Sequence, residues 1–291
     1  MVEPSGAPLL ITGATGTLGQ ALARVAQHRG LHAHLTARSE LDLQDPASIR
    51  GAIERIRPWA IINAAGYVRV ADAENDRDAC FAANAGGVVH LATVAADFGV
   101  PLVGVSTDLV FDGHDGPYRE SDSPNPKGVY GSSKRESELT LIEASAANLV
   151  VRTAAFFGPW DMHNFAWHTL NALRRGERVE ASDAARISPT YVPDLCYAML
   201  DLLVDGASGL WHLTNAGSMS WYQFGRRLAD RAGIDSSGLV ATGREPSDTS
   251  LVSEHGALLR PLDAAINDYC AQFTRIEQAL QHYAVESQPA A

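Results

Sequence analysis

Short apolar segments alternate with longer segments of helical periodicity through the first half of the chain. Residues 9–11 (Leu-Leu-Ile) form an apolar run that ends near a glycine, which is typical of a buried parallel strand. The same alternation continues, with strands expected at 32–36, 60–63, 101–106 and 148–152 and helices at 46–56, 79–98 and 130–144. This alternation predicts an α/β fold, with a doubly wound parallel sheet of the Rossmann type.

The second half of the chain is less regular. One strand is expected at 210–213, and helices are expected at 165–175, 192–203, 221–232, 263–269 and 275–283. Ser220 is the expected N-cap of the third of these helices, and residues 285–291 are expected to fray. We therefore expect two parts: an NAD(P)-binding Rossmann domain at 1–155, completed by roughly 187–216, and a smaller C-terminal substrate-binding lobe at 156–186 and 217–291.

A glycine-rich loop follows the first expected strand. Gly13, Gly16 and Gly19 give the spacing GxxGxxG between that strand and a helix. Glycines permit a tight turn and a close approach of the backbone to pyrophosphate, and the helix N-terminus offers free N–H groups. This position predicts a dinucleotide site with contacts from Gly13, Thr15, Gly16, Thr17, Leu18 and Gly19.

The end of the second expected strand bears on the choice of cofactor. An acidic residue there would accept hydrogen bonds from the ribose 2′-hydroxyl, whereas this chain has Arg38. A guanidinium can pair with a 2′-phosphate, which favours NADPH. Glu40 lies two residues further on and would restore a preference for NAD if the loop turns it inward, so NAD stays open.

Tyr130 and Lys134 begin an expected helix with the spacing YxxxK, which places both on one helix face. A nearby ammonium favours the phenolate form, so we expect Lys134 to lower the pKa of Tyr130 and also to hold a ribose hydroxyl. Ser106, Thr107 and Asp108 lie at the carboxyl end of the fourth expected strand, where open α/β sheets bind ligands. A hydroxyl there can donate to a substrate carbonyl oxygen.

Composition and charge narrow the partners. The 23 Lys and Arg against 34 Asp and Glu give a net charge of −11, which disfavours nucleic acid and anionic lipid. No run of about 18 consecutive apolar residues occurs, and the N-terminus lacks a signal-peptide pattern, so we expect a cytoplasmic protein without a membrane partner. The three cysteines form no CxxC pair and the ten histidines show no metal-ligand spacing, so no metal is expected.

Several sequence blocks resemble one family. They are 63–67 (NAAGY), 105–113 (VSTDLVFDG), 117–120 (PYRE), 130–134 (YGSSK), 151–153 (VRT), 188–190 (SPT) with 194–195 (DL), and 209–213 (GLWHL). With these blocks the chain resembles an extended short-chain dehydrogenase/reductase and is most similar to the dTDP-4-dehydrorhamnose reductase family. The resemblance implies NAD(P)H-dependent reduction of a 4-keto group on a nucleotide-linked deoxysugar, with Thr107, Tyr130 and Lys134 as the catalytic set.

The resemblance also implies further contacts. Asp42 and Leu43 resemble a pair that lies beside the adenine ring in related proteins, and cofactor contacts are implied for Ala64, Ala65, Gly66, Tyr67 and Ser106. Substrate contacts are expected from Thr107, Asp108, Phe156, Arg186 and Arg260. Arg260 matches an arginine that the family places near the nucleotide diphosphate.

The chain departs from the family where the sugar is bound. The acid and lysine of the segment after the third strand are absent in place at 69–74, and 154–157 (AAFF) lacks the family's tryptophan. Residues 184–187 also replace a family motif. Trp160, His163, Asn164 and Phe165 are candidates to line the sugar pocket instead. The reductase class is therefore expected, while dTDP-4-dehydrorhamnose itself does not follow as the substrate.

Two other functions stay open at this stage. A nucleotide-sugar epimerase or dehydratase with tightly bound NAD would use the same scaffold. A non-catalytic regulatory subunit that binds NADP would account for the altered sugar contacts, although the intact tyrosine and lysine argue against it. A homodimer is compatible with the sequence.

Overall fold

The computed structural model describes residues 6–159, 161–243 and 246–286 of the chain. Its centre is a six-stranded sheet with the order β10-β5-β4-β3-β1-β2, in which every pair is parallel. The strands are β1 (Leu9–Thr12), β2 (Ala33–Thr36), β3 (Ala60–Asn63), β4 (Leu102–Thr107), β5 (Leu149–Thr153) and β10 (Gly209–His212). Each lies within one or two residues of the position that the apolar runs predict, and the sheet confirms the predicted fold class.

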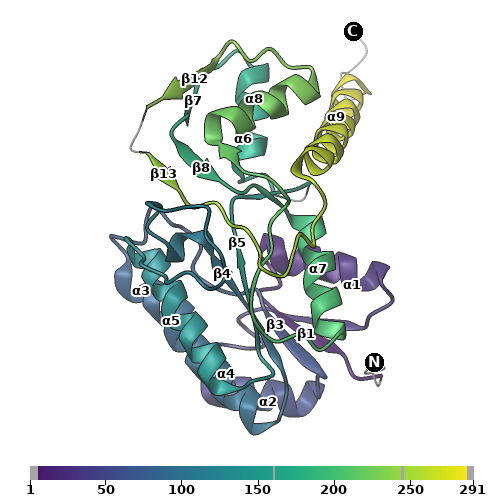
Figure 1. The fold of residues 1–291 in the computed structure, drawn as a ribbon. Helices are drawn as coiled ribbons and strands as arrows, with labels where there is room; N and C mark the ends of the chain where they lie inside the picture. The colour runs from purple at the N-terminus through teal and green to yellow at the C-terminus, as the bar shows by residue number, and fades with distance from the viewer. Residues whose placement is uncertain (1–5, 160, 244–245, 287–291) are drawn as a thin grey trace.

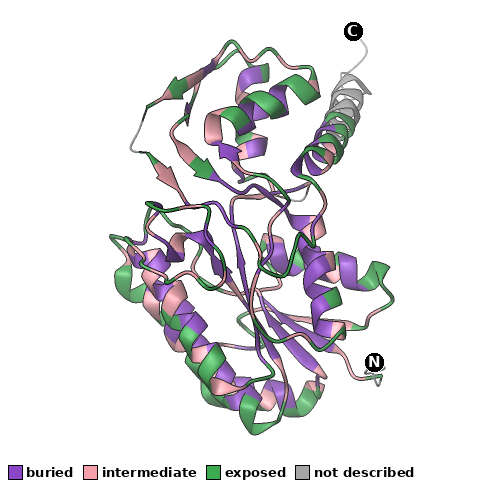
Figure 2. Ribbon diagram, viewed as in Figure 1, coloured by how far each residue is buried: buried purple, intermediate pink, exposed green. Residues whose placement is uncertain are grey.

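Helices cover both faces of this sheet (Figure 1). The helices α1 (Thr17–His28) and α7 (Val192–Val204) contact each other and pack on one face. The other face carries α2 (Pro46–Ile56), α4 (Gly87–Asp97) and α5 (Val129–Ala144). Figure 2 shows the central strands buried and the helices buried along one side, which is the pattern of a sheet covered on both faces.

The helix expected at 79–98 is interrupted. The structure has α3 (Arg77–Phe81), then a π-helical turn at Ala82–Gly86, then α4. The Asn84 side chain within this turn accepts a hydrogen bond from the Tyr67 N–H at 2.8 Å and donates to the Tyr67 carbonyl at 3.1 Å. The turn thereby fixes the loop after β3, consistent with the tendency of π-bulges to occur at functional sites.

The same helical stretch is apolar. Arg77–Asp97 has a mean hydropathy of 1.5 and, by length and composition alone, could cross a membrane. Half of its most apolar window is buried inside the fold, however, and the core helix of a globular protein has the same composition.

The rest of the chain forms a smaller group of elements above the carboxyl ends of the large sheet (Figure 1). Its helices are α6 (Phe165–Arg174), α8 (Trp221–Ala232) and α9 (Leu262–Glu286). Its short strands are β6 (Phe156–Phe157), β7 (Val179–Ser182), β8 (Ala185–Ile187), β9 (Thr190–Tyr191), β11 (Met219–Ser220), β12 (Leu239–Thr242) and β13 (Ser247–Asp248). The order β11-β8-β13 makes a three-stranded sheet, while β12 pairs with β7 and β6 with β9.

The C-terminal helices differ from expectation. The two helices expected at 263–269 and 275–283 are one continuous helix, α9, because neither proline nor glycine occurs between Leu262 and Glu286 to end it. Residues 285–286 belong to this helix, and residues 287–291 of the expected frayed end lie outside the described residues.

We propose that the boundaries inferred from the sequence divide the molecule into a dinucleotide-binding domain and a substrate-binding lobe. Support comes from the apolar clusters: two lie on the faces of the large sheet, and a third joins Phe157, Leu170, Phe224 and Ile266 from α6, α8, α9 and β6. Each part therefore has its own core.

The start of α8 offers a test of local structure. Ser220 Oγ accepts a hydrogen bond from the Gln223 N–H at 3.2 Å, and the Gln223 side chain accepts one from the Ser220 N–H at 3.0 Å, so the two residues form a capping box. We expect Ser220→Ala to lower the free energy of unfolding by about 1 kcal/mol in urea denaturation. Gln223→Ala should cost less in the Ser220→Ala background than in the wild type; equal costs would show that the two bonds are independent.

Candidate active site

A cleft of about 1480 Å³ runs along the carboxyl ends of β1, β3, β4 and β5 and continues between the two parts of the molecule. It is the location at which open parallel sheets bind ligands. Residues from both parts line it, including Gly13, Lys134, Arg186 and Thr249.

Backbone geometry explains the glycine loop. Gly13 has a φ of +74°, and a Cβ on it would lie 2.7 Å from the Ala64 carbonyl oxygen. A Cβ on Gly19 would lie 2.3 Å from the Gly13 carbonyl oxygen, so only a glycine at this position lets α1 pack so closely on the loop. Gly16 is the N-cap of α1 and no side chain caps this end, which leaves it suited to a pyrophosphate. Gly13, Thr15, Gly16, Thr17 and Leu18 line the cleft, whereas Gly19 supports the loop from behind.

The loop after β2 orients Arg38 and Glu40 differently. Arg38 lines the cleft with 79% of its side chain exposed, and its Nε lies 3.4 Å from Asp42 Oδ2. The carboxylate of Glu40 accepts a hydrogen bond from the Ala37 N–H at 3.2 Å and is not among the residues that line the cleft. Asp42 and Leu43 both line it. The cationic group, and not Glu40, therefore borders the cofactor end.

Hydrogen bonds to the buried Asn63 side chain hold the loop after β3. Thr12 Oγ1 donates to Asn63 Oδ1 at 2.6 Å, and the Ala65 N–H donates to the same oxygen at 3.2 Å. The stretch 64–67 predicted to contact the cofactor lines the cleft throughout.

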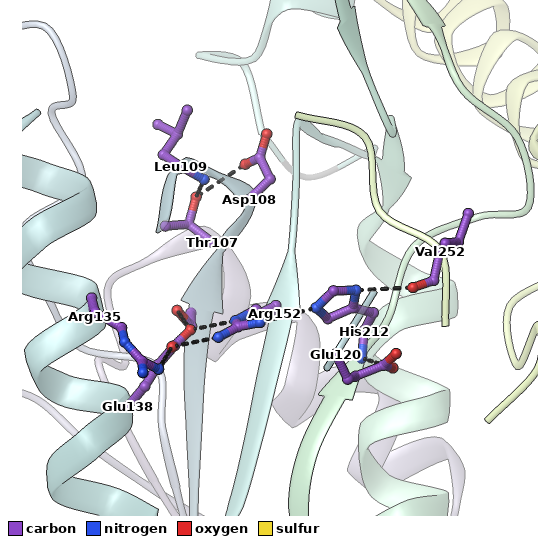
Figure 3. A network of polar contacts seen from close by, with 10 residues as sticks. Thr107, Asp108, Leu109, Glu120, Arg135, Glu138, Arg152, His212 and Val252 are labelled. Atoms are coloured by element: carbon purple, nitrogen blue, oxygen red, sulfur yellow. Dashed lines mark hydrogen bonds and ion pairs between the residues drawn. The ribbon is translucent and has the colours of Figure 1, made fainter. Parts of the chain in front are cut away.

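Thr107 ends β4 and caps a short 3₁₀ turn at Asp108–Val110 (Figure 3). Its Oγ1 accepts a hydrogen bond from the Leu109 N–H at 3.2 Å and donates to Asp108 Oδ1 at 3.1 Å. Asp108 Oδ2 accepts a hydrogen bond from Thr249 Oγ1 at 2.6 Å. Burial raises the pKa of Asp108 to about 6, although the two hydroxyl donors oppose the shift.

Tyr130 and Lys134 both line the cleft from the first turns of α5. Close packing places them there: a Cβ on Gly131 would lie 2.1 Å from the Leu109 carbonyl oxygen. Burial lowers the pKa of Lys134 to about 8, while the nearby Glu138 carboxylate opposes this shift.

The expected lowering of the Tyr130 pKa is wrong for this structure. Burial disfavours the phenolate, and the charge of Asp108 adds to that effect, so the pKa of Tyr130 is raised. A tyrosine that keeps its proton at neutral pH is suited to act as a proton donor.

A buried ion pair between Glu138 and Arg152 lies below Thr107 in the view of Figure 3. Glu138, one helical turn after Lys134, accepts hydrogen bonds from Arg152 Nε at 2.7 Å and Nη2 at 2.8 Å. Ser106 Oγ donates to the same carboxylate at 2.6 Å, and Arg135 Nη1 donates at 2.9 Å. Burial would raise the pKa of Glu138, but the Arg152 hydrogen bonds and charge hold it below its usual value. The pair ties β4, α5 and β5 together beneath the site.

The network extends to the second half of the chain. Arg152 Nη1 lies 3.3 Å from His212 Nε2, and His212 Nδ1 lies 3.0 Å from the Val252 carbonyl oxygen. Glu120 accepts hydrogen bonds from the His212 N–H at 2.7 Å and from Ser253 Oγ at 2.7 Å. Neither Glu138 nor Arg152 was expected to take part in the site. The signals for them in the sequence are a charged residue within a buried strand and a carboxylate four positions after Lys134.

The expected substrate contacts divide into two groups. Thr107, Asp108, Phe156 and Arg186 line the cleft. Arg186 donates to Ser218 Oγ at 2.9 Å and faces Asp248 at 3.5 Å. These four residues are therefore within reach of a ligand in the cleft.

Arg260 is not among the cleft residues. Its guanidinium pairs with Asp194 at 2.8 Å and with Asp268 at 2.6 Å, and its role in substrate binding stays a prediction. The carboxylates of Asp194 and Asp268 therefore already pair with the Arg260 guanidinium within the fold.

The candidates after β6 also separate. His163 lines the cleft, whereas Asn164 caps α6 by accepting a hydrogen bond from the Trp167 N–H at 2.8 Å. Phe165 packs against Trp221 in the third apolar cluster, and Trp160 lies outside the described residues. Among the described residues no group of three or more His, Cys, Asp or Glu is placed to hold a metal ion.

A glycine loop, a Tyr–Lys pair and a threonine around one cleft of a doubly wound sheet define an NAD(P)-dependent reductase of the extended short-chain dehydrogenase/reductase class. Residues 7–282 match the family described as the RmlD substrate binding domain. The chain belongs to this family.

Several similar proteins are named as reductases of dTDP-linked sugars. A dTDP-4-keto-6-deoxy-D-glucose reductase from Streptomyces niveus is 36% identical over 230 residues, covering 78% of this chain and 79% of the relative. A dTDP-4-dehydrorhamnose reductase from Mycobacterium tuberculosis is 37% identical over 236 residues, covering 78% and 76%. The structure of a dTDP-4-dehydrorhamnose reductase from Bacillus anthracis in complex with NADP has a TM-score of 0.85 at 25% identity, covering 90% of this chain and 98% of that one.

The buried ion pair should contribute strongly to stability. Glu138→Gln leaves the Arg152 guanidinium buried without a compensating charge, so we expect the free energy of unfolding to fall by about 3 kcal/mol or more in chemical denaturation. Glu143→Gln, an exposed position on the same helix, is the matched control and should change it by less than about 0.5 kcal/mol. A loss below about 1 kcal/mol for Glu138→Gln would mean that solvent or another anion replaces the carboxylate.

Proposed function

We propose that the protein is an NADPH-dependent reductase of a nucleotide-linked 4-keto-deoxysugar. The observation that carries the proposal is that Thr107, Tyr130 and Lys134 line the same cleft as the glycine loop. The similar proteins named above are reductases of dTDP-linked keto-deoxysugars, which points to the same substrate class for this chain.

The residues at the cofactor end fit a dinucleotide. A Cβ at Gly13 would collide with the backbone of the loop after β3, and the uncapped N-terminus of α1 offers N–H groups for the pyrophosphate. The adenosine end would be held by Arg38, Asp42 and Leu43. Arg38 favours a 2′-phosphate and hence NADP, as in the Bacillus anthracis relative; NAD stays the alternative because Asp42 shares the Arg38 charge.

The chain's own groups then act on the substrate carbonyl. A nicotinamide, when bound, would supply the hydride that reduces the C4 carbon. Tyr130 keeps its proton at neutral pH and donates it to the carbonyl oxygen, and Thr107 polarises that oxygen by a hydrogen bond. Lys134, whose ammonium lies on the same face of α5, binds the nicotinamide ribose and stabilises the tyrosinate that forms.

The sugar end differs from the cofactor end. Asp108, Phe156 and Arg186 line it, and the Arg186 guanidinium can form charge-assisted hydrogen bonds with a diphosphate. An epimerase or dehydratase would use the same scaffold, and its NAD would remain bound during dialysis. A regulatory NADP-binding subunit would bind dinucleotide without turnover.

The remaining assignments stay predictions: a cytoplasmic location, no nucleic-acid or membrane partner, and a homodimer as the assembly to be tested. A net charge of −11 supports the absence of nucleic-acid and anionic-membrane partners, because like charges repel.

A screen of NADPH oxidation against a panel of nucleotide-4-ketosugars tests the proposal. Turnover with at least one dTDP-linked member, and product reduced at C4 by NMR, is the expected result. Tight dinucleotide binding with no turnover across the panel would favour the regulatory reading.

Arg38 should decide the cofactor. We expect Arg38→Ala to raise the Kd for NADPH about tenfold in a fluorescence titration, because one charge-assisted contact to the 2′-phosphate is lost. The Kd for NADH should change by less than about twofold. Tighter binding of NADH than NADPH by the wild type would contradict the assignment.

Tyr130 and Lys134 should show different kinetic signatures. Tyr130→Phe removes the proton donor and keeps the ring, so kcat should fall by about 10² or more while the cofactor Kd stays within a few-fold. Lys134→Met should weaken both kcat and cofactor binding, because the ammonium serves both. If Tyr130→Phe retains most of the turnover, another group supplies the proton.

A further inference from the structure

The hydrogen bond between Thr107 and Asp108 limits what the Thr107 hydroxyl can donate to a substrate. A threonine hydroxyl has one hydrogen to donate. In the structure Thr107 Oγ1 accepts from the Leu109 N–H and gives its single hydrogen to Asp108 Oδ1 at 3.1 Å. With Asp108 ionised, the hydroxyl therefore has no hydrogen left for a substrate carbonyl oxygen.

We propose that Asp108 is a positioning residue that works as the neutral acid: its proton is donated to Thr107 Oγ1, which turns the threonine hydrogen toward the substrate carbonyl. No proton is consumed, since the one on Asp108 stays there through turnover. The inference rests on the proposed function, because it assigns Thr107 the task of polarising a carbonyl.

The surroundings of Asp108 support a neutral acid. Asp108 is 6% exposed, and the donors that face its carboxyl group are neutral: the hydroxyls of Thr107 and Thr249 and the backbone N–H groups of Asp108 and Leu109. Tyr130 on α5 is the titratable neighbour, and its phenolate would repel a carboxylate. Burial raises the pKa of Asp108 to about 6, so the acid form is accessible near neutral pH.

Thr249 connects this acid to the second part of the molecule. It follows β13, its N–H donates to the Arg186 carbonyl at 3.2 Å, and its hydroxyl reaches Asp108 Oδ2 at 2.6 Å. Its hydroxyl hydrogen stabilises the carboxylate form of Asp108. The position of this strand thus influences whether Thr107 is free to donate.

The pH dependence of kcat/KM with NADPH and the active ketosugar tests the inference. The wild-type value should fall about tenfold per pH unit once Asp108 ionises, from about pH 6 upward. Asp108→Asn presents an amide N–H to Thr107 at every pH. Its profile should lose this limb, whatever the absolute value of its kcat/KM. Thr249→Val removes a donor to the carboxylate and should move the limb to higher pH.

The controls separate this from a structural effect. Asp115→Asn, an exposed change of the same charge, should retain the wild-type limb. The fall above about pH 8 that Lys134 causes should persist in every variant. A limb that survives in Asp108→Asn would overturn the proposal.

A measurement without turnover distinguishes failure of this inference from failure of the proposed function. The Asp108 carboxyl signal is assigned in ¹³C NMR by its absence from Asp108→Asn and is titrated in the protein with NADPH. A pKa at or above about 6 supports the neutral acid even if no ketosugar reacts; a pKa near 4 overturns it whatever the substrate screen shows.

Discussion

The buried pair of Glu138 and Arg152 is the constraint on which the site depends. Ser106 precedes Thr107 on β4, Glu138 follows Lys134 by one turn of α5, and Arg152 lies on β5. A single carboxylate therefore links the two elements that carry the proposed catalytic groups. Such a pair is costly to break because either partner alone would be a buried uncompensated charge. The relative positions of Thr107 and Lys134 therefore depend on this buried pair, together with the close packing of Gly131 against the Leu109 carbonyl.

Much of the fold could be predicted because its signals are local. A buried parallel strand such as β1 is a short apolar run, and the Gly13–Gly19 loop and the Tyr130–Lys134 spacing are complete within a few residues. The break expected between residues 269 and 275 was wrong, because neither proline nor glycine occurs there to end α9. The short strands β8 and β13 carry no periodic signal of their own and exist only through pairing.

The polar network escaped prediction because its partners are distant in sequence. Thr249 is 141 positions from Asp108, and Arg152 is 60 from His212. Resemblance to a family placed Arg260 near a diphosphate, while the fold supplies Asp194 and Asp268 as its partners. Periodicity identifies which face of an element is buried; it carries no information on which buried charges meet. Burial raises the pKa of both Asp108 and Tyr130, and the hydroxyl contacts of Asp108 oppose the shift of its own pKa.

Backbone constrains the glycine-loop end of the cleft, whereas side chains form the sugar end. This difference explains why the sequence departs from the family mainly at the sugar end. At the glycine loop the backbone itself is constrained: Gly13 and Gly19 have no room for a Cβ, so substitution there distorts the loop. At the sugar end Phe156 and Arg186 present side chains, and exchanging them leaves the backbone in place. A chain can therefore change its sugar contacts while it retains the dinucleotide loop and the Tyr130–Lys134 pair. Because Thr249 bridges the two ends through Asp108, a change in how the sugar is held can still reach the catalytic threonine.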